Sequence, residues 1–507
     1  MKIAMKFRVF LMLFCLIPTL QTTIAQDYRA INTDATSYFI DSISKDIIAL
    51  RIDSTSTSGA DNLYYGFRQM KQTDYGCYTI NGGSWIGDEV TEKPDGTFIF
   101  TVYPFSPPDS SSNYRILSRR VPGQPWIFYT YHTINHHIEA VVTEVRLMSF
   151  LGITDSVKTI SLTCKDAVGQ VVSDPVNNQK ILLSKNYGLI RLPKFDDFIE
   201  YNRFYDIVGK TNPKTGITNL TTLAIYDFQP GDELHSVWHD QGSPVPFTIM
   251  DGATIMRVLE RISPVSGDSV TYRMEICQLS RYQFSPTEYS YYHSFDTVYK
   301  TYSCPGAPLL EAEPLEPVPI YNDMTTYSFM GFLNDPAIPL YDLPVKFIRN
   351  SMLWTEQDGC YSMITFDGCW YSDIYIQGLG GPYHNCNDFG WGPSYNLLKY
   401  YKKGNITWGS PLVCDSILTV GVGELNAEKA LSIYPNPSPG SISVIIPDGI
   451  QLPCRLELFD LSGRLMTGFQ QLQVYQNFDI SGLPPGIYGY RIRSANGDVF
   501  QGKIIRQ

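Results

Sequence analysis

Short runs of alternating apolar and polar residues fill the chain from about Tyr28 to Cys304. Because successive side chains on a strand point to opposite faces, this alternation predicts half-buried β-strands. Gly, Asp, Asn and Pro, which favour tight turns, separate the runs. Consecutive strands with short connections predict an antiparallel meander, curved into a sandwich or partial barrel. The clearest predicted strands are Thr97–Tyr103, Trp126–Tyr131, Ala140–Leu147, Lys158–Cys164 and Ser269–Cys277.

Two stretches interrupt this pattern and predict the domain organisation. Residues 305–319 are rich in proline and glutamate, and proline cannot donate to a central sheet ladder, so this stretch predicts a linker. Residues 421–429 predict a second linker. The predicted parts are a β-rich ectodomain at 26–304, the Pro-rich linker at 305–319, a Cys-rich β region at 320–420, the linker at 421–429 and a small β domain at 430–507.

Composition strengthens the all-β prediction and excludes one class of partner. Aromatic residues make up 13% of the 507 residues, with 35 Tyr and 26 Phe, and these types fit a pleated, half-buried surface. The formal net charge is -11, and no cluster of Lys and Arg occurs. Proteins that bind nucleic acid need such clusters to neutralise phosphates. We therefore expect no nucleic-acid partner.

The first 25 residues have the pattern of a secretory signal peptide. Basic residues, among them Lys2 and Arg8, precede the apolar run from Val9 to Ile17, and small residues lead up to Ala25. This order predicts cleavage after Ala25. The run is shorter than the roughly 20 apolar residues that span a bilayer. No other stretch reaches that length, so we expect no transmembrane segment in the mature chain.

Export to an oxidising compartment makes disulfide bonds the expected state of the cysteines. Four cysteines crowd one segment without the CxxC spacing of zinc sites, so disulfides are favoured over a metal there. A further pair is expected between Cys277 and Cys304. Cys77, Cys164 and Cys454 cannot all pair among themselves. The disulfide candidates are Cys360, Cys369, Cys386, Cys414, Cys277 and Cys304.

Residues 430–507 carry short motifs in a fixed order, and their strands and tight turns predict a small immunoglobulin-like β-sandwich. The motifs are Y-P-N-P, then D-x-x-G-R, then D-I-S-x-L-x-x-G-x-Y, then a final G-K. This order resembles the type A C-terminal sorting domain of type IX secretion system cargo proteins. The motif residues are Tyr434, Pro435, Asn436, Pro437, Asp460, Gly463, Arg464, Asp479, Leu483, Gly486, Tyr488, Gly502 and Lys503.

The resemblance implies a route and two partners. The chain would be secreted, or displayed on the outer surface of a Gram-negative bacterium, after passing the type IX translocon. A surface protease would remove the tail near residues 421–430. Further stretches are similar to uncharacterised cargo proteins of this system, which supply no activity. They are Ser84–Gly87, Asp155–Ile160, Leu183–Ile190, Ile376–Gly381 and Tyr400–Gly404.

Histidine pairs are the candidates for a metal site. His235 and His239 would be zinc ligands on a helix, but four residues along a strand they lie roughly 13 Å apart. Gly231 and the β-rich surroundings favour a strand, and we expect a solvated or hydrogen-bonded pair with no metal. His132, His136 and His137 are expected at the exposed tip of a hairpin.

No motif assigns catalytic residues or a cofactor. GxSxG, HExxH and phosphate-binding glycine loops are absent from the sequence. Adjacent carboxylates, Asp196–Asp197 and Asp232–Glu233, are expected to be solvated turn residues, since neighbours on a strand face opposite sides. Aromatic clusters at Tyr289–His293, Trp370–Tyr371 and Trp391 could stack on sugar rings.

Two functions therefore remain open at the level of sequence. The first is a non-catalytic binding or adhesion module that takes a polysaccharide or cell-surface ligand. The second is a secreted hydrolase of glycosidase or metallohydrolase type, whose catalytic groups would be assembled from distant strands.

Overall fold

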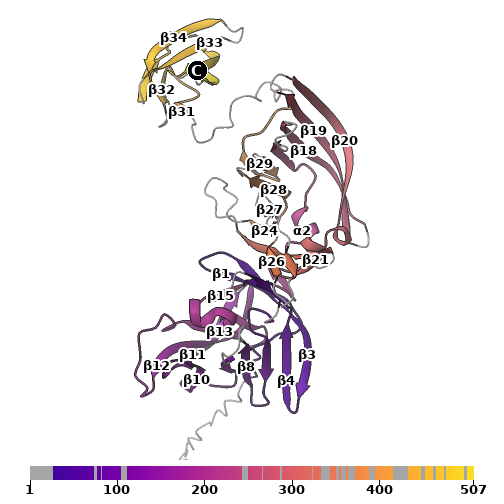
Figure 1. Cartoon of the computed structure of the whole chain (residues 1–507), viewed down its shortest axis with the longest axis vertical. Helices are drawn as coiled ribbons and strands as arrows, with labels where there is room; N and C mark the ends of the chain where they lie inside the picture. Colours follow the sequence, from indigo (N-terminus) through magenta and orange to yellow (C-terminus); the bar gives the residue numbers. More distant parts are fainter. Residues whose placement is uncertain are drawn as a thin grey trace, which may run out of the picture. The chain divides into compact units, whose positions relative to one another are not determined.

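The structure is a computed structural model (Figure 1), in which strands hold 63% of the described residues and helices 5%. The all-β prediction is confirmed. The chain forms two compact units, residues 1–411 and 412–507. No helix in the described part is long and apolar enough to cross a membrane. The structure describes residues 27–72, 77–80, 83–103, 111–241, 249–264, 267–285, 288–321, 324–332, 343–349, 353–355, 361–363, 372–386, 394–414, 432–446, 452–460, 464–472, 475–495 and 499–507.

The larger unit begins with an antiparallel meander, as the alternating pattern predicts. Each strand from β10 to β15 pairs with the next along the chain. β1 (Ser37–Asp41) continues the sheet beside β15 and pairs in turn with β2 (Ile47–Leu50). The meander strands are β10 (Pro125–Thr130), β11 (His136–Phe150), β12 (Ile153–Asp166), β13 (Lys180–Ser184), β14 (Gly188–Pro193) and β15 (Phe204–Thr211).

A second, five-stranded sheet shares a hydrophobic core with the meander. In β8 the alternation buries Phe98 and Phe100, and these rings join a core to which the meander contributes Phe128. Trp85 is fully buried there, and its indole N–H donates to the carbonyl oxygen of Ala49 at 2.7 Å. The strands of this sheet are β3 (Ile52–Ser58), β4 (Asp61–Gly66), β7 (Glu89–Glu92), β8 (Thr97–Val102) and β9 (Ser112–Leu117).

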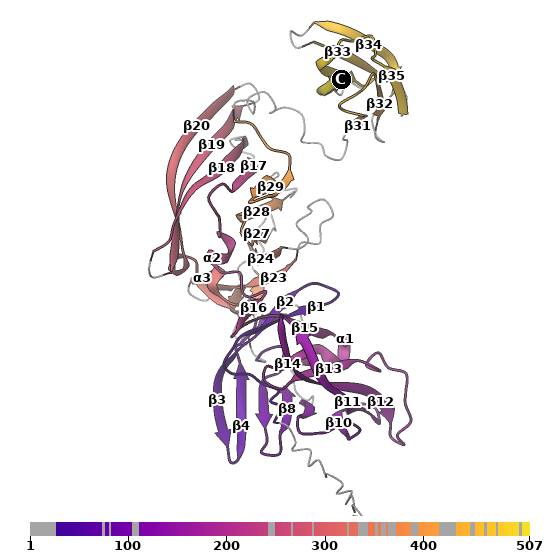
Figure 2. The same cartoon turned by 180° about the vertical axis from the view of Figure 1, so that it is seen from behind.

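Four long strands, β17 to β20, form an antiparallel ribbon in the second half of this unit, with β20 outermost (Figures 1 and 2). On its other side β17 pairs with β29. The pairing then continues through β28, β27, β24 and β23 to β2, where Ile47 lies opposite Met330. The ribbon strands are β17 (Glu233–Gln241), β18 (Ile249–Ile262), β19 (Ser269–Ser285) and β20 (Glu288–Ser303).

Strands from residues 318–409 complete sheets that begin in residues 37–303. β26 pairs with β6 (Tyr78–Thr79), beside β5 (Lys71–Gln72), in a small sheet, and β29 pairs with β17. The grouping of residues 1–411 as one unit therefore does not follow the predicted division at 305–319. The later strands are β21 (Val318–Tyr321), β22 (Met324–Thr326), β23 (Ser328–Phe332), β24 (Pro344–Arg349), β25 (Leu353–Thr355), β26 (Tyr361–Met363), β27 (Ser372–Ile376), β28 (Gly380–Cys386), β29 (Ser394–Lys403) and β30 (Ile406–Gly409).

The C-terminal unit is a two-sheet sandwich, in agreement with the predicted small β domain. One sheet has three strands and the other has four, and Val444, Leu456 and Ile504 are fully buried between them. The predicted linker at 421–429 lies outside the described residues. The strands are β31 (Ser432–Tyr434), β32 (Ser441–Ile445) and β35 (Tyr475–Asp479) in one sheet, and β34 (Leu465–Leu472), β33 (Cys454–Phe459), β36 (Gly486–Arg493) and β37 (Val499–Arg506) in the other.

The Pro-rich segment is folded into the larger unit by a buried lysine. The ammonium group of Lys346, on β24, donates to the carbonyl oxygens of Leu310 and Ala312, both at 2.7 Å, and to the side chain of Asn219 at 2.9 Å. Lys346 is fully buried, and burial lowers its pKa to about 7. A buried ammonium is tolerated only with such partners, so the carbonyl groups of the segment are held in place by the same bonds.

Leu310 lies in α3 (Pro308–Glu311), and beyond it two glutamates attach the segment to the first strands. The carboxylate of Glu313 accepts a hydrogen bond from the hydroxyl of Tyr38, on β1, at 3.0 Å. Glu316 forms an ion pair with Arg51 at 2.8 Å. Residues 305–319 therefore connect the two halves of one unit by buried polar contacts.

We predict that Lys346→Met destabilises the chain by about 3 kcal/mol, because three buried acceptors lose their donor while the side-chain volume is kept. Urea unfolding followed by tryptophan fluorescence measures the loss. Lys214→Met, at an exposed position, is the control and should change the midpoint little. Equal midpoints for the two variants would contradict this role of Lys346.

Candidate functional site

A stripe of exposed aromatic side chains runs along β20. Tyr291, Phe295 and Tyr299 are 60%, 61% and 67% exposed. They are spaced four residues apart and so project from one face of the strand. On the opposite face Val298 and Tyr302 pack against the core. Aromatic rings left outside in a linear series indicate a binding surface, because residues of this size normally contribute to cores or interfaces.

The sequence pattern indicates only part of this stripe. The cluster Tyr289–His293 was a candidate, but Phe295 and Tyr299 were missed. The available signal was the recurrence of aromatic residues at 291, 295 and 299. Because Tyr292 and Tyr302 place aromatic rings on the other face as well, the sequence could not tell which face was exposed. Trp370, Tyr371 and Trp391 lie outside the described residues.

Ion pairs lie beside the stripe on the neighbouring strands. Tyr299 is opposite Arg273, which pairs with Glu260 at 3.2 Å. Tyr291 is opposite Arg281, which pairs with Asp251 at 2.9 Å. This surface, here called the β20 face, thus combines flat apolar rings with hydrogen-bonding groups whose charges cancel in pairs.

His235 and His239 lie on β17, as the strand prediction requires, but they are buried rather than solvated, at 1% and 5% exposure. His235 Nε2 lies 2.8 Å from Glu233 Oε1, and Glu233 also accepts from Arg257 at 3.2 Å. The ring of His239 stacks on Tyr395 at 5.3 Å between centroids. Burial lowers the pKa of both histidines. In the described part, neither belongs to a group of three potential metal ligands.

The prediction of an exposed hairpin tip fits His132 but not His136 and His137, which are half-buried residues of a strand. His132 is exposed in the turn between β10 and β11, and the other two begin β11. The paired carboxylates, by contrast, are not solvated turn residues. Asp196 and Asp197 both contact the ammonium group of Lys194, at 2.9 and 2.7 Å, and their side chains are mostly buried.

The second carboxylate pair is engaged in the same way. Asp232 is buried and forms an ion pair with Lys403 at 3.0 Å. Glu233 is held by His235 and Arg257. Both carboxylates are thus held by ion pairs on or beside β17.

Disulfide bonds occur at Cys77, Cys277, Cys386 and Cys414. The predicted pair Cys277–Cys304 is wrong, since Cys304 is a free thiol at the start of η2 (Cys304–Gly306). The two residues lie far apart along the β19–β20 hairpin, where Cys277 is opposite Phe295. Cys164 is a free buried thiol. Cys360 and Cys369 lie outside the described residues.

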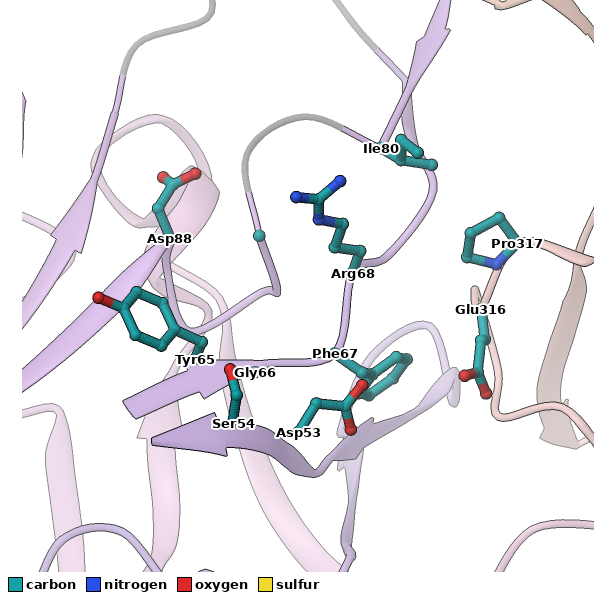
Figure 3. Close-up of a pocket in the computed structure, with 11 residues that line it drawn as sticks. Asp53, Ser54, Tyr65, Gly66, Phe67, Arg68, Ile80, Asp88, Glu316 and Pro317 are labelled. Atoms are coloured by element: carbon teal, nitrogen blue, oxygen red, sulfur yellow. The ribbon is translucent and has the colours of Figure 1, made fainter. Parts of the chain in front are cut away.

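A cleft of about 610 Å³ opens beside β3 and β4 (Figure 3). Arg51 pairs with both Asp53 and Glu316, at 2.7 and 2.8 Å. Asp88 accepts the backbone N–H of Tyr103 at 2.8 Å. The carboxylates of the cleft are therefore held by an arginine and a backbone N–H group. Its lining residues are Asp53, Ser54, Tyr65, Gly66, Phe67, Arg68, Ile80, Gly83, Asp88, Glu316 and Pro317.

In the C-terminal sandwich, the motif residues hold the fold together. The side chain of Asn436 donates to the carbonyl oxygen of Lys503 at 2.9 Å and accepts the N–H of Ile505 at 2.8 Å, which ties the Y-P-N-P segment to β37. Asp460 accepts the backbone N–H of Arg464 at 3.0 Å and closes the turn after β33. Gly463 lies outside the described residues.

Four further motif residues serve turn formation and packing. Asp479 accepts the N–H of Ser481 at 2.8 Å, and the buried Tyr488 donates its hydroxyl to the carbonyl oxygen of Pro484 at 2.7 Å. Leu483 packs against the core. At Gly502 a Cβ atom would lie 2.6 Å from the ring of Tyr490, so only glycine fits without displacing that ring.

Residues 432–507 match the family model of the secretion system C-terminal sorting domain. The chain is a cargo protein of the type IX secretion system. Its sorting domain directs export, so the cargo protein is secreted or carried to the cell surface, and it interacts with the type IX machinery.

Other comparisons add no function to the rest of the cargo protein. No curated protein matches it. Among solved structures it is similar to the extracellular domain of a proposed one-component system from B. thetaiotaomicron, at 7% identity and a TM-score of 0.13, with 95% of this chain and 99% of that chain covered. A second structure, described as the extracellular domain of a proposed hybrid two-component system from the same organism, also has 7% identity and a TM-score of 0.13, with 93% and 91% covered.

We predict that Asn436→Ala lowers the stability of the sorting domain by about 1–2 kcal/mol, because two hydrogen bonds to β37 are lost. The exported fraction should fall as well, because the sorting domain directs export. The measurement is the fraction of the ectodomain, with or without its tail, found outside the producing bacteria, together with thermal unfolding of the purified variant. Arg493→Gln, at an exposed position of the same domain outside the motifs, is the control. Normal export of a destabilised Asn436→Ala chain would refute the link between fold and export.

A second prediction concerns pH. Burial lowers the pKa of His239, against the opposing effect of Asp251 and Asp240 and with a smaller lowering by Arg281. Below pH about 6.5 the histidine is protonated in the unfolded chain but still neutral in the folded chain, whose pKa is lower. The free energy of unfolding therefore falls as the pH falls from about 6.5 to the pKa of the folded chain. His239→Phe keeps the ring on Tyr395 and should show a smaller drop in unfolding temperature between pH 7.5 and 5.5. His132→Phe, at an exposed site, should behave as wild type. If the unfolding temperature of His239→Phe fell between pH 7.5 and 5.5 by as much as that of the wild type, the proposed effect of His239 would be contradicted.

Proposed function

We propose that the exported cargo protein is a non-catalytic binding module that takes an extended polysaccharide along the β20 face. The observation that carries this proposal is the stripe of Tyr291, Phe295 and Tyr299, three rings left exposed on one face of one strand. The aromatic face of a ring stacks on the apolar face of a sugar. A row of rings at roughly 13 Å intervals suits a polymer that repeats such faces.

The ion pairs beside the stripe support the same ligand class. Arg273 with Glu260 and Arg281 with Asp251 offer donors and acceptors for sugar hydroxyl groups next to the rings. Because each charge has a partner, the surface carries no strong local field that would select a highly charged polymer. A neutral or weakly charged polysaccharide is therefore the proposed ligand.

A hydrolase has less support. The cleft beside β3 and β4 contains three carboxylates, but Asp53 and Glu316 share Arg51, and Asp88 is bound by a backbone N–H. A glycosidase needs one carboxyl group able to give a proton and another able to attack or to activate water. Among the described residues of the cleft, each of these three carboxylates is already bound by an arginine or a backbone N–H group.

The proposal also includes the route of export. Residues 1–25 act as a signal peptide for the inner membrane of a Gram-negative bacterium, and the type IX translocon then carries the chain across the outer membrane. A surface protease removes the sorting domain near residues 421–430. The basic, apolar and small-residue order of the N-terminus supports the first step, and the sorting domain supports the second.

The test is retention of the purified cargo protein on a panel of neutral polysaccharides, by pull-down for insoluble polymers and affinity electrophoresis for soluble ones. The double variant Tyr291→Ala with Tyr299→Ala should bind at least tenfold more weakly, since each stacked ring contributes about 0.5–1.5 kcal/mol beyond its buried area. Tyr201→Ala, at an exposed tyrosine outside the β20 face, is the matched control. Undiminished retention of the double variant would overturn the proposal, as would release of reducing ends from the bound polymer.

A further inference from the structure

The outer edge of β20 has no partner strand in the described part of the chain, where β20 pairs with β19 alone. The edge is long, since β20 runs for 16 residues. Native proteins protect exposed edges with lysine, proline, bulges or covering segments. β20 contains no proline and a single lysine, Lys300. Such an edge is a template for another strand.

The side chains of β20 are arranged symmetrically about Phe295, with Tyr291 four residues before it and Tyr299 four residues after it. When two copies of this strand pair antiparallel about Phe295, residues at equal distances on either side of it lie opposite each other. Phe295 then faces Phe295 of the second copy, and Tyr291 faces Tyr299 at both ends. Cross-strand aromatic pairs of this kind stabilise antiparallel strands by about 0.2–1 kcal/mol each.

The other face of the strand fits the same register. Tyr292 lies opposite Val298 of the second copy, Ser294 opposite Asp296 and Ser290 opposite Lys300, so no like charges meet. Moving the centre one residue towards the C-terminus would put Asp296 opposite Asp296, which is unfavourable. Moving it one residue the other way would put Phe295 opposite His293 and Tyr291 opposite Thr297. Moving it by two residues would lose at least one of the three aromatic pairs. The register centred on Phe295 also overlaps almost the full length of β20.

We propose that the cargo protein forms a two-fold symmetric dimer in which the β20 strands of two copies pair antiparallel about Phe295. The symmetry of the side chains favours a second copy over an unrelated strand, because a two-fold interface must be complementary to itself. The two-fold axis stands perpendicular to the sheet, so the β20 faces of both copies join into one surface with six rings. This inference does not depend on polysaccharide binding, since edge pairing uses the backbone and leaves the rings on the open face.

A charge exchange at position 295 tests the dimer with the full chain. Wild type should sediment as a dimer in analytical ultracentrifugation. Phe295→Lys and Phe295→Glu should each be monomeric, with a dimer dissociation constant at least tenfold higher, because like charges then face each other across the axis. An equimolar mixture of the two variants should form heterodimers, since lysine then faces glutamate. Thr301→Lys, on the same face but away from the axis, should remain dimeric.

Circular dichroism and unfolding temperature verify that each variant is folded, and the mixture makes the test independent of any loss of stability. A monomeric wild type, a dimeric Phe295→Lys chain or a failure of the mixture to associate would each overturn the proposal. Retention on polysaccharides is measured separately. A dimer that binds no polysaccharide would contradict the proposed function alone, and a monomer that binds would contradict the dimer alone.

Discussion

The arrangement of residues 27–411 depends on the hydrogen bonds of one buried ammonium group. Lys346 lies on β24 with no exposed surface, and the main-chain carbonyl groups of Leu310 and Ala312 are among its partners. An ammonium group in an apolar core is stable only when its donors are used. The Pro-rich segment therefore has to fold inward, where its glutamates reach Tyr38 and Arg51. In this way the first and last strands of the unit become parts of one sheet.

That continuity explains why the binding surface is found on β20. The pairing runs from the meander through β2 and β23 to the ribbon, and β20 is its last described strand. One face of β20 packs against the core through Val298 and Tyr302. On the other face Tyr291, Phe295 and Tyr299 are exposed, and the outer edge of β20 has no partner strand in the described part of the chain. The exposed rings and the open edge are thus two results of one position in the sheet, and they allow ligand binding and self-association to coexist.

The sorting domain uses its motif residues in a different way. Asn436, Asp460, Asp479 and Tyr488 make hydrogen bonds that close turns or join strands, and Gly502 leaves room for the ring of Tyr490. These residues define a fold rather than a row of contacts for a partner. The motifs of Asp460 and Asp479 each form a local turn that can be recognised from sequence, whereas the bonds of Asn436 to Lys503 and Ile505 join distant segments.

The sequence by itself determined the all-β class, individual strands such as those predicted at 97–103 and 269–277, the hairpin that carries His132 and the identity of the sorting domain. Alternation, turn residues and short motifs are local, so they can be read without the fold. Tertiary structure decided what depends on distant neighbours. It buried His235 and His239 and paired Asp196 and Asp232 with lysines. It also left Cys304 as a free thiol not bonded to Cys277, and folded residues 305–319 inward. Finally, it exposed Tyr291, Phe295 and Tyr299. Each of these outcomes depends on which strands become neighbours, because burial and pairing are set by contacts between residues far apart in the chain.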